Sequence, residues 1–341
     1  MKLKSLFTQD LAIDLGTANT VVMSEGNIIL DEPSIVAIDV ETEKVLAIGQ
    51  EAQRMHGKTH KRIETIRPLK DGVIADFRAA ELFIKELIKK VRPKKYFFSP
   101  MLKLVIAIPS GSTDVERRAV KDSSEQAGAN EVYLVYEPLA AAIGLGIDIE
   151  APEGNMIIDI GGGTTEIAVI SLAGIVTCSS IKIAGDVFTK DIMDYMQENY
   201  HLRINETIAE EIKISVGAAL TDLDDPPPDK LIVVPAQQSP IPIEQPVSYT
   251  EIANCLNRSI ERIEAEIGRV LEKTPPELYR EIVKNGIFLT GGGSLLRGLD
   301  KRFTEKFQIQ FKRAEKPLLT VAKGVGIILE EFDKFQSILI K

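Results

Sequence analysis

The amino-acid sequence predicts an α/β protein made of two lobes that share one design. Residues 11–24 and 156–171 follow the same order: an apolar strand ending in an aspartate, a tight turn that contains glycine, and a second apolar strand. The two aspartates, Asp14 and Asp159, are separated by about the length of one domain. Apolar segments of helical and strand periodicity alternate along the chain, which is typical of sheets with helices on both faces. We therefore expect an internal duplication, with one strand–turn–strand motif in each lobe.

Helices and strands are expected to alternate around both motifs. In the first half we expect a helix over residues 75–91, a buried strand at 104–108, a helix opened by a capping box of Thr113 and Glu116, a strand at 132–135 and a short helix at 139–144. In the second half we expect helices over residues 186–200, 208–220 and 250–273, then a strand at 287–290 that runs into three glycines and a further helix.

The bulk composition narrows the class of protein. With 341 residues, 44% of them hydrophobic and 27% charged, the chain has the composition of an ordinary globular protein with room for two cores. A formal net charge of −9 argues against general binding of nucleic acid, which needs a basic surface to neutralise phosphates. Cys178 and Cys255 both lie in apolar sequence, so we expect buried thiols in a reducing compartment rather than a disulfide.

Membrane contact, if any, is expected at the surface of a bilayer. No apolar run is long enough to cross one, and no signal peptide is visible. Residues 1–7 combine lysines with Leu3, Leu6 and Phe7, which fits a short interfacial helix. A frayed terminus is the favoured alternative, because seven residues bury little area.

The first turn, residues 14–20, offers backbone N–H groups between small side chains, and such turns can bind phosphate oxygens. Asp14 would repel a phosphate directly, so we expect it to hold Mg²⁺ through water. A plain β-turn, in which Asp14 accepts local backbone hydrogen bonds, is the simpler alternative and is ahead when this motif is taken alone.

The second turn, residues 159–165, changes that balance. Gly161, Gly162 and Gly163 lie between apolar strands, where glycine lowers strand stability, so we infer that a ligand approaches the backbone closely. Asp159 is expected to face the same metal ion, and the Thr164 hydroxyl a water molecule or the terminal phosphate. Two matched aspartate turns, one lobe apart, therefore predict a site for ATP or a closely related purine nucleotide and its magnesium.

A third glycine turn follows the predicted strand at 287–290. Gly291, Gly292, Gly293 and Ser294 present backbone N–H groups that suit an adenosine or an α-phosphate. A plain glycine-rich connection between strand and helix is the common alternative.

The three turns resemble the phosphate-1, phosphate-2 and adenosine motifs of the actin, heat-shock-chaperone and sugar-kinase superfamily. Over nearly its whole length the chain is similar to the MreB family, the bacterial actin homologues of rod-shape determination. The segments that carry the resemblance are I-D-L-G-T-A-N-T at 13–20, E-P-S-I-V-A at 32–37, R-P-L-K-D-G-V-I-A-D at 67–76, V-E-R-R-A at 115–119, E-P-L-A-A-A-I-G at 137–144, I-D-I-G-G-G-T-T-E-I-A-V-I-S at 158–171 and residues 289–296.

The resemblance implies an actin-like fold of two lobes, each a ribonuclease-H-like domain with a mixed five-stranded sheet and a smaller inserted subdomain. It places the first lobe at residues 1–142 and 318–341, with an insert at about 32–70. The second lobe would take residues 143–317, with an insert at about 182–244.

The resemblance also assigns roles. It implies ATP or ADP as ligand, with Mg²⁺ held through water by Asp14 and Asp159. Glu137 would position the attacking water, assisted by Thr164 and Asp159, since phosphoryl transfer needs an in-line water and charge neutralisation more than covalent chemistry. Glu137 also suits the start of a helix, where the macrodipole favours an acid, and both roles are compatible. The implied nucleotide contacts are Thr17, Ala18, Asn19, Gly161, Gly162, Gly163, Glu210, Glu211, Ile212, Lys213, Gly291, Gly292, Gly293 and Ser294.

The function implied in this way is that of a slow ATPase whose nucleotide controls assembly. The resemblance implies paired head-to-tail protofilaments on the inner face of the cell membrane, with membrane proteins of the cell-wall elongation machinery as partners. Residues 94–98 match a membrane-touching loop of the family, although a packing loop before the next strand is nearly as good an interpretation. A small-molecule kinase of the same superfamily is the alternative function, and a protein that binds ATP without hydrolysing it is a third.

The chain departs from its relatives in one stretch near the second turn. Many relatives have G-G-D-x-F-D-E where this sequence has A-G-D-V-F-T-K at residues 184–190, so Thr189 and Lys190 replace two acids. A second departure is N-E-T-I-A-E at 205–210, where G-E-x-T-A-E is common. Filament contacts or nucleotide turnover are the properties that the first change puts in doubt.

Overall fold

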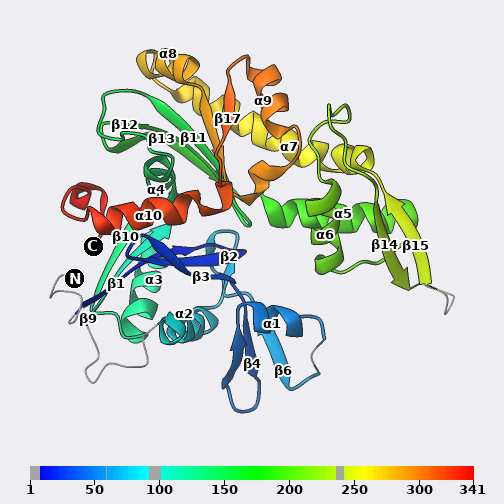
Figure 1. The fold of residues 1–341 in the computed structure, drawn as a ribbon, viewed down its shortest axis with the longest axis horizontal. Helices are drawn as coiled ribbons and strands as arrows, with labels where there is room; N and C mark the ends of the chain where they lie inside the picture. The colour runs from blue at the N-terminus through cyan, green and yellow to red at the C-terminus, as the bar shows by residue number, and fades with distance from the viewer. Residues whose placement is uncertain (1–7, 59, 92–100, 236–241) are drawn as a thin grey trace. The chain divides into compact units, whose positions relative to one another are not determined.

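A computed structural model describes residues 8–58, 60–91, 101–235 and 242–341 (Figure 1). Its internal contacts divide the chain into two compact units: Met1–Glu153, Ile170–Ser180 and Leu318–Lys341 form the first, and Gly154–Val169 and Ile181–Pro317 form the second. The lobe and insert boundaries expected from the sequence stay predictions. Residues 1–7 and 94–98, the two candidate membrane-contacting segments, lie outside the described residues.

The first unit is built on a five-stranded mixed sheet in the order β10-β9-β1-β2-β3. Strands β10, β9 and β1 run parallel, whereas β2 and β3 continue the sheet as antiparallel hairpins from β1. Parallel neighbours need a crossover, and the helices between these strands provide it. The strands are β1 (Thr8–Leu15), β2 (Asn19–Ser24), β3 (Asn27–Pro33), β9 (Met101–Ile108) and β10 (Glu131–Tyr136).

Helices cover both faces of this sheet (Figure 1). Helix α2 (Phe77–Val91) buries Phe83 and Leu87 in one cluster with Leu11 and Ile13 of β1. Helix α3 (Asp114–Gln126) packs on the same side and begins with the predicted capping box, in which the Glu116 amide donates to Thr113 Oγ1 at 3.3 Å and the Thr113 amide to Glu116 Oε2 at 2.7 Å. Helices α4 (Glu137–Gly144) and α10 (Thr320–Glu330) lie on the other face.

Two glycines let α4 and α10 approach backbone to backbone. A Cβ atom on Gly324 would lie 1.7 Å from the carbonyl oxygen of Ala140, and one on Gly144 would lie 2.0 Å from the carbonyl oxygen of Thr320. No other residue type fits either position without moving a helix. This contact fixes α4, and with it Glu137 at the start of the helix, against the sheet.

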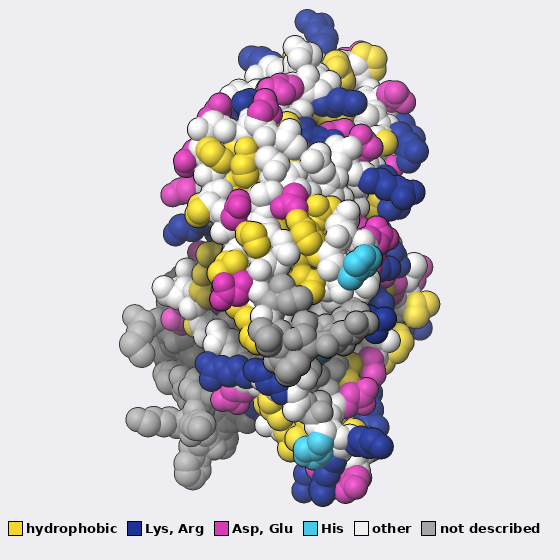
Figure 2. Space-filling view, turned by 90° about the vertical axis from the view of Figure 1, so that its right-hand side faces the viewer, with side chains coloured by type: hydrophobic (Ala, Val, Ile, Leu, Met, Phe, Trp, Pro, Cys, Tyr) yellow, Lys and Arg dark blue, Asp and Glu magenta, His cyan; other side chains and the backbone are white. Residues whose placement is uncertain are grey.

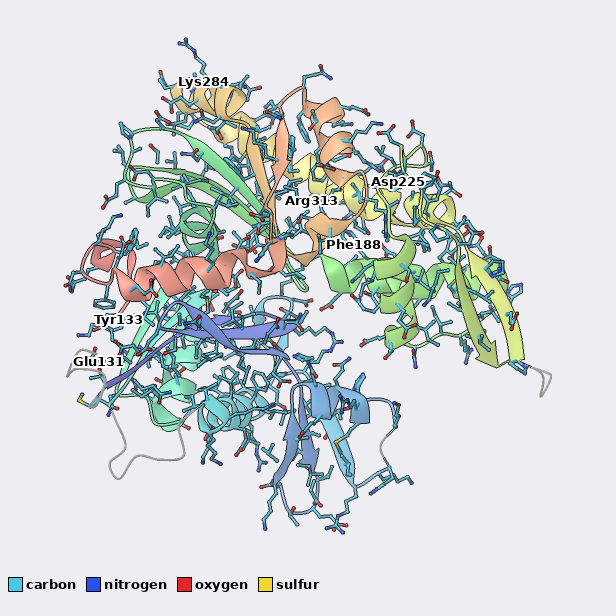
Figure 3. The ribbon with its side chains drawn as sticks, viewed as in Figure 1. Glu131, Tyr133, Phe188, Asp225, Lys284 and Arg313 are labelled. Carbon is cyan, nitrogen blue, oxygen red and sulfur yellow. The ribbon has the colours of Figure 1, made fainter. Side chains whose placement is uncertain are left out.

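The chain end covers the outer strand of this sheet. The Leu134 amide donates to the Ile340 carbonyl oxygen and the Ile340 amide to the Leu134 carbonyl oxygen, each at 2.8 Å. Tyr133, which stands on β10 near Glu131 (Figure 3), packs edge to face on Phe332 with 4.9 Å between ring centroids. Pairing of this kind keeps part of an edge strand from joining other chains.

A smaller group of elements completes the first unit. A three-stranded sheet in the order β5-β4-β6 packs on helix α1, with Ile35, Ala37 and Ala52 buried between them. A two-stranded sheet, β7 with β8, follows. The elements are β4 (Val36–Asp39), β5 (Val45–Ile48), α1 (Gln50–Met55), β6 (Ile63–Ile66), β7 (Leu69–Lys70) and β8 (Val73–Ile74).

The second five-stranded sheet repeats the first. Its order, β13-β12-β11-β16-β17, is that of β3-β2-β1-β9-β10, strand for strand. Strands β11, β16 and β17 run parallel, as do β1, β9 and β10. The strands are β11 (Asn155–Ile160), β12 (Thr165–Ser171), β13 (Gly174–Ile181), β16 (Ile287–Thr290) and β17 (Phe311–Arg313). The internal duplication and the two mixed five-stranded sheets predicted from the sequence are therefore confirmed.

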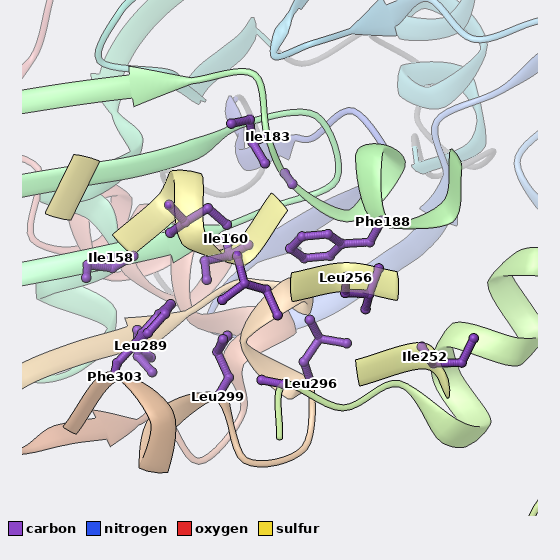
Figure 4. Close-up of a cluster of buried hydrophobic side chains, with 14 of the residues drawn as sticks. Ile158, Ile160, Ile183, Phe188, Ile252, Leu256, Leu289, Leu296, Leu299 and Phe303 are labelled. Carbon is purple, nitrogen blue, oxygen red and sulfur yellow. The ribbon is translucent and has the colours of Figure 1, made fainter. Parts of the chain in front are cut away.

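The core of the second unit lies where its helices meet this sheet (Figure 4). Ile158, Ile160 and Leu289 from the strands pack with Phe188 of α5 and Leu256 of α7 in one buried cluster. Helix α6 and the β14–β15 hairpin pack beside α5. The elements are α5 (Gly185–Tyr200), α6 (Glu206–Val216), β14 (Lys230–Pro235), β15 (Pro242–Val247), α7 (Tyr249–Lys273), α8 (Pro276–Asn285) and α9 (Leu299–Phe307).

Three expectations from the sequence need correction. The helix expected over 208–220 ends at Val216, because Gly217 leaves the helical conformation and Ala218 bridges to Arg297. A 3₁₀ helix, Gly292–Leu295, contains the second and third of these glycines and precedes the next α-helix. Cys178 is exposed rather than buried, because it stands on β13, the outermost strand of its sheet.

The surface carries mixed charge. On the face drawn in Figure 2, lysine and arginine are interspersed with aspartate and glutamate, and the coloured side chains form no continuous basic stripe. Among the described residues, no helix combines the length and hydropathy needed to span a bilayer.

The contact between α4 and α10 predicts an unequal response to two glycine substitutions. We expect Gly324→Ala to lower the free energy of unfolding by about 2 kcal/mol or more, because the added methyl group meets a backbone carbonyl that cannot move alone. Gly268→Ala in α7 is the control, since its Cβ would lie 4.0 Å from Phe307 and alanine favours a helix by about 0.5–1 kcal/mol. Urea denaturation followed by circular dichroism measures both, and equal midpoints would contradict the expectation.

Candidate functional site

In the first unit, the candidate residues gather at the carboxyl ends of the three parallel strands. Asp14 of β1 is in register with Ala107 of β9, which is in register with Val135 of β10. Glu137 follows β10 directly as the first residue of α4. Ligands of open α/β sheets bind at this end of parallel strands, so Asp14 and Glu137 both stand where the fold offers a site.

Asp14 is a carboxylate at the end of a buried strand. Its neighbours along β1 point into the core, and strand alternation turns Asp14 to the opposite face, the one covered by α4 and α10. Across the sheet, Val21 separates Asp14 from Asp31 of β3. Burial raises the pKa of the Asp14 carboxyl to about 7, and the negative charge of Asp31 adds to the rise. A cation beside Asp14 would reverse both effects.

The turn after Asp14 is closed and held by backbone contacts. The Gly16 amide donates to the Asn19 carbonyl oxygen at 3.1 Å, and a Cβ on Gly16 would lie 2.7 Å from that oxygen. Ser34 fixes the turn from β3's end, since its hydroxyl donates to the Gly16 carbonyl oxygen at 2.6 Å and its amide to that of Ala18 at 2.9 Å. Ala18 and Asn19 are exposed, whereas Thr17 is buried and accepts from the Gly72 amide at 3.1 Å.

The second unit brings Asp159 and the third glycine turn together. Asp159 of β11 is buried and is in register with Thr290 of β16. Gly291 follows with φ of +78°, and a Cβ there would lie 2.2 Å from Asp159 Oδ1. A Cβ on Gly293 would lie 2.3 Å from Ile160 Cγ2. Glycine is therefore required at both positions by the close approach of the two chain segments.

The triglycine turn is anchored from behind by the start of α5. The Gly161 amide donates to the Thr164 carbonyl oxygen at 2.9 Å, closing the turn. The carbonyl oxygens of Gly161 and Gly162 accept from the amides of Gly185 and Asp186 at 3.1 and 2.8 Å. The start of α5 thus fixes the triglycine turn through its carbonyl groups.

The residues expected on α6 have different surroundings. The Lys213 ammonium lies 2.7 Å from Glu210 Oε2 and donates to the Gly185 carbonyl oxygen at 2.9 Å. Glu211 pairs with Lys230 of β14 at 3.5 Å, and the Ile212 side chain is in the hydrophobic core. Glu210 and Lys213 are thus the two side chains of this helix that extend toward the triglycine turn.

Ser294, the last of the expected nucleotide contacts, is hydrogen-bonded within the protein. Ser294 is buried and its hydroxyl donates to the Gly291 carbonyl oxygen at 2.7 Å, within its own turn. Three further residues contact the expected site residues: Ser34, Gly72 and Thr189. None of them was expected from the sequence to contact the nucleotide. Ser34 could have been found from the E-P-S-I-V-A segment, whereas the contact from Gly72 is set by tertiary folding alone.

The chain is similar to known proteins over nearly its whole length. Residues 8–337 match the profile of the MreB/Mbl protein family. The chain is 44% identical to the cell shape-determining protein Mbl of Bacillus subtilis (strain 168), over 96% of this chain and 98% of that protein. The chain belongs to the MreB/Mbl family.

Other members agree in sequence and in fold. The cell shape-determining protein MreB of Escherichia coli (strain K12) is 42% identical, over 97% of this chain and 96% of that protein. The crystal structure of MreB5 of Spiroplasma citri bound to ADP superposes with a TM-score of 0.90 at 37% identity, over 97% of this chain and 99% of that one. The MamK double helical filament, at 20% identity and a TM-score of 0.79, shares the fold.

The raised pKa of Asp14 predicts that Asp14→Asn changes the free energy of unfolding by an amount that depends on pH. The folded-state pKa of about 7 exceeds the ordinary value of 3.8, so the folded state binds the proton more tightly and loses stability as pH rises toward 7. Asparagine cannot ionise and escapes this loss. Without nucleotide or magnesium, we expect the variant's gain in free energy of unfolding to be about 1 kcal/mol larger at pH 8 than at pH 6. Thermal melts in EDTA measure the gain. An equal gain at both pH values would show that the pKa of Asp14 is not raised in the folded state.

Proposed function

We propose that this chain is a filament-forming ATPase that binds magnesium-bound ATP, with the Asp14 turn of the first unit and the Asp159 turn of the second as its candidate contacts. The observation that carries the proposal is the repeated end of strand: in each unit a carboxylate terminates a buried parallel strand beside a backbone turn that is held by its carbonyl groups. Two similar structures, MreB5 of Spiroplasma citri bound to ADP and bound to AMPPNP, support a nucleotide as the ligand.

The donor groups fit magnesium. Asp14 and Asp159 supply hard carboxylate oxygens, which Mg²⁺ prefers, and the ion keeps several water ligands when only one or two carboxylates hold it. The pKa of Asp14, raised by burial and by Asp31, shows a cost of ionisation that a cation would offset. When bound, the ion would neutralise charge on the phosphate oxygens.

Glu137 is the residue to which we assign water positioning. It opens α4, which the glycine contact with α10 fixes on the sheet, so its carboxylate stands on a rigid element. Thr164 is buried at the end of the triglycine turn and would assist with its hydroxyl. Thr17, Ala18 and Asn19 would contact the phosphates, with Glu210 and Lys213 nearer the ribose and residues 291–294 nearer the base.

In this proposal the bound nucleotide controls the assembly of the protein into filaments. We infer head-to-tail filaments, paired, at the inner face of the membrane, with membrane proteins of cell-wall elongation as partners and cell shape as outcome. The names of the relatives, cell shape-determining proteins, support this outcome. We infer a cytoplasmic protein at that surface from the family resemblance. Heterologous contacts that do not close into a ring produce filaments.

A small-molecule kinase of the same fold is the alternative function. It would transfer the phosphate to an added acceptor instead of water, whereas a protein that only binds ATP would release no phosphate at all. Measuring ADP formation and free phosphate with and without sugar acceptors separates the three functions.

Glu137→Ala should separate hydrolysis from binding. We expect phosphate release to fall by about 100-fold, because positioning a water and its proton contributes on that order, while ATP affinity changes less than threefold. Glu131→Ala, at the amino end of the strand β10 that Glu137 follows, is the matched control and should leave release unchanged. A variant with unaltered phosphate release would remove Glu137 from the proposed role.

Nucleotide-dependent assembly is tested on a lipid layer. We expect the wild-type chain with ATP and magnesium to form filaments visible by electron microscopy, and Asp159→Ala to form none, because the second metal-facing carboxylate is lost. Asp225→Ala changes an exposed acid in a loop and serves as the control (Figure 3). Filaments of equal length from the wild type and Asp159→Ala would disconnect assembly from this site.

A further inference from the structure

Thr189 stands in a compact polar cluster beside the second turn. Its hydroxyl oxygen lies 2.7 Å from Glu210 Oε2, 2.9 Å from Lys213 Nζ and 2.9 Å from the carbonyl oxygen of Gly185. Thr189 is buried, and it belongs to α5 whereas Glu210 and Lys213 belong to α6. The hydroxyl therefore joins the two helices at one point.

Counting donors shows which group of this cluster is left to meet a ligand. A lysine ammonium has three N–H donors, and Lys213 has three acceptors in the Gly185 carbonyl oxygen, Thr189 Oγ1 and Glu210 Oε2. The ammonium is saturated by the protein, and its side chain is 14% exposed. The Glu210 side chain is 46% exposed. Its contacts with Thr189 and Lys213 are both made by one oxygen, Oε2.

The cluster is tied to the triglycine turn through a single residue. The amide of Gly185 donates to the Gly161 carbonyl oxygen at 3.1 Å, while its own carbonyl oxygen accepts from Lys213 at 2.9 Å. A Cβ on Gly185 would lie 3.3 Å from both partners. The turn and the Glu210–Lys213 pair are thus held in one geometry by the first residues of α5.

A neutral side chain at position 189 matters for the charge of this cluster. One ammonium and one carboxylate give no net charge, and the threonine hydroxyl can donate its proton to Glu210 while accepting from Lys213. An acid at this position would place a second negative charge within hydrogen-bond distance of Glu210 Oε2. The hydroxyl instead leaves the ammonium as the sole counter-charge of Glu210 in the cluster.

We propose that Thr189 is a positioning residue of the nucleotide site, which holds Glu210 and Lys213 as one fixed pair and thereby presents the second Glu210 oxygen to the hydroxyl groups of a bound ribose. This inference rests on the proposed function. A carboxylate accepts hydrogen bonds and repels phosphate, so the sugar hydroxyls are the part of ATP that it can bind. A fixed acceptor distinguishes a ligand with the hydroxyl from one without it, because the unpaired polar group is costly.

The test compares the affinities for nucleotides that differ only in the hydroxyl groups of the sugar. Binding of ATP, 2′-deoxy-ATP and 3′-deoxy-ATP is measured by competition with a fluorescent ATP analogue for the wild type, Thr189→Val and Thr189→Ser. We expect the wild type to favour ATP over at least one deoxy analogue by about 10-fold. Thr189→Val should lower that preference to less than about threefold, and Thr189→Ser, which keeps the hydroxyl, should retain it.

Thr274→Val is the matched control for stability. Thr274 is 7% exposed against 6% for Thr189, and its hydroxyl also donates to a carbonyl oxygen four residues earlier, that of Val270, at 2.7 Å. Both valine variants should lower the melting temperature, but Thr274→Val should leave the sugar preference intact. If Thr189→Val does not fold, Thr189→Ala removes the same hydroxyl with no added bulk.

The outcomes separate this inference from the proposed function. Equal loss of affinity for all three nucleotides in Thr189→Val, or a wild type that binds ATP without preferring it to either deoxy analogue, would overturn the role of Thr189 and leave ATP binding standing. A wild type that binds none of the nucleotides would overturn both.

Discussion

Placing an ionisable carboxylate at the end of an apolar strand is the constraint on which the rest of this structure depends. Asp14 ends a strand whose alternate residues fill the core, and burial together with Asp31 raises its pKa to about 7. Such a position is unfavourable for folding and persists where a function needs it. The strand order places Asp14 and Glu137 at one edge, and the repeat of that order places Asp159 and Gly291 at the matching edge of the second sheet. Both candidate half-sites are consequences of the same topology.

Around these carboxylates, backbone groups do most of the positioning. Ser34 holds the first turn by its carbonyl oxygens, and the amides at the start of α5 hold the second in the same way. Glycine is required where two chain segments meet, as at Gly291 beside Asp159 and at Gly324 beside Ala140. Turns of this kind can bind phosphate oxygens, which agrees with the proposed role in phosphate binding. Thr189 adds a side-chain contact to this framework by joining α5 to Glu210 and Lys213 of α6.

Local signals were sufficient for much of this picture. The period of apolar residues, the capping box at Thr113 and Glu116, and the repeated aspartate turn are short-range patterns, and the structure has each of them. Errors occurred where packing outweighs such patterns. The helix expected over 208–220 ends early because Gly217 and Ala218 contact Arg297, which lies 80 positions after Gly217 in the chain. Cys178 is exposed because β13 has a neighbour on one side only, which apolar neighbours in the sequence do not reveal.

The sequence by itself determined the duplicated α/β fold, the family and the identity of the two aspartates, because each depends on residues close together in the chain. Only the tertiary structure decided what surrounds those residues. That Ser34 closes the first turn, that Gly291 must lack a side chain beside Asp159, and that Thr189 joins Glu210 to Lys213 all depend on atoms brought together from separate elements. Such contacts leave no periodic mark in the sequence, since hydrogen bonds and close approaches are set by packing geometry and not by spacing along the chain.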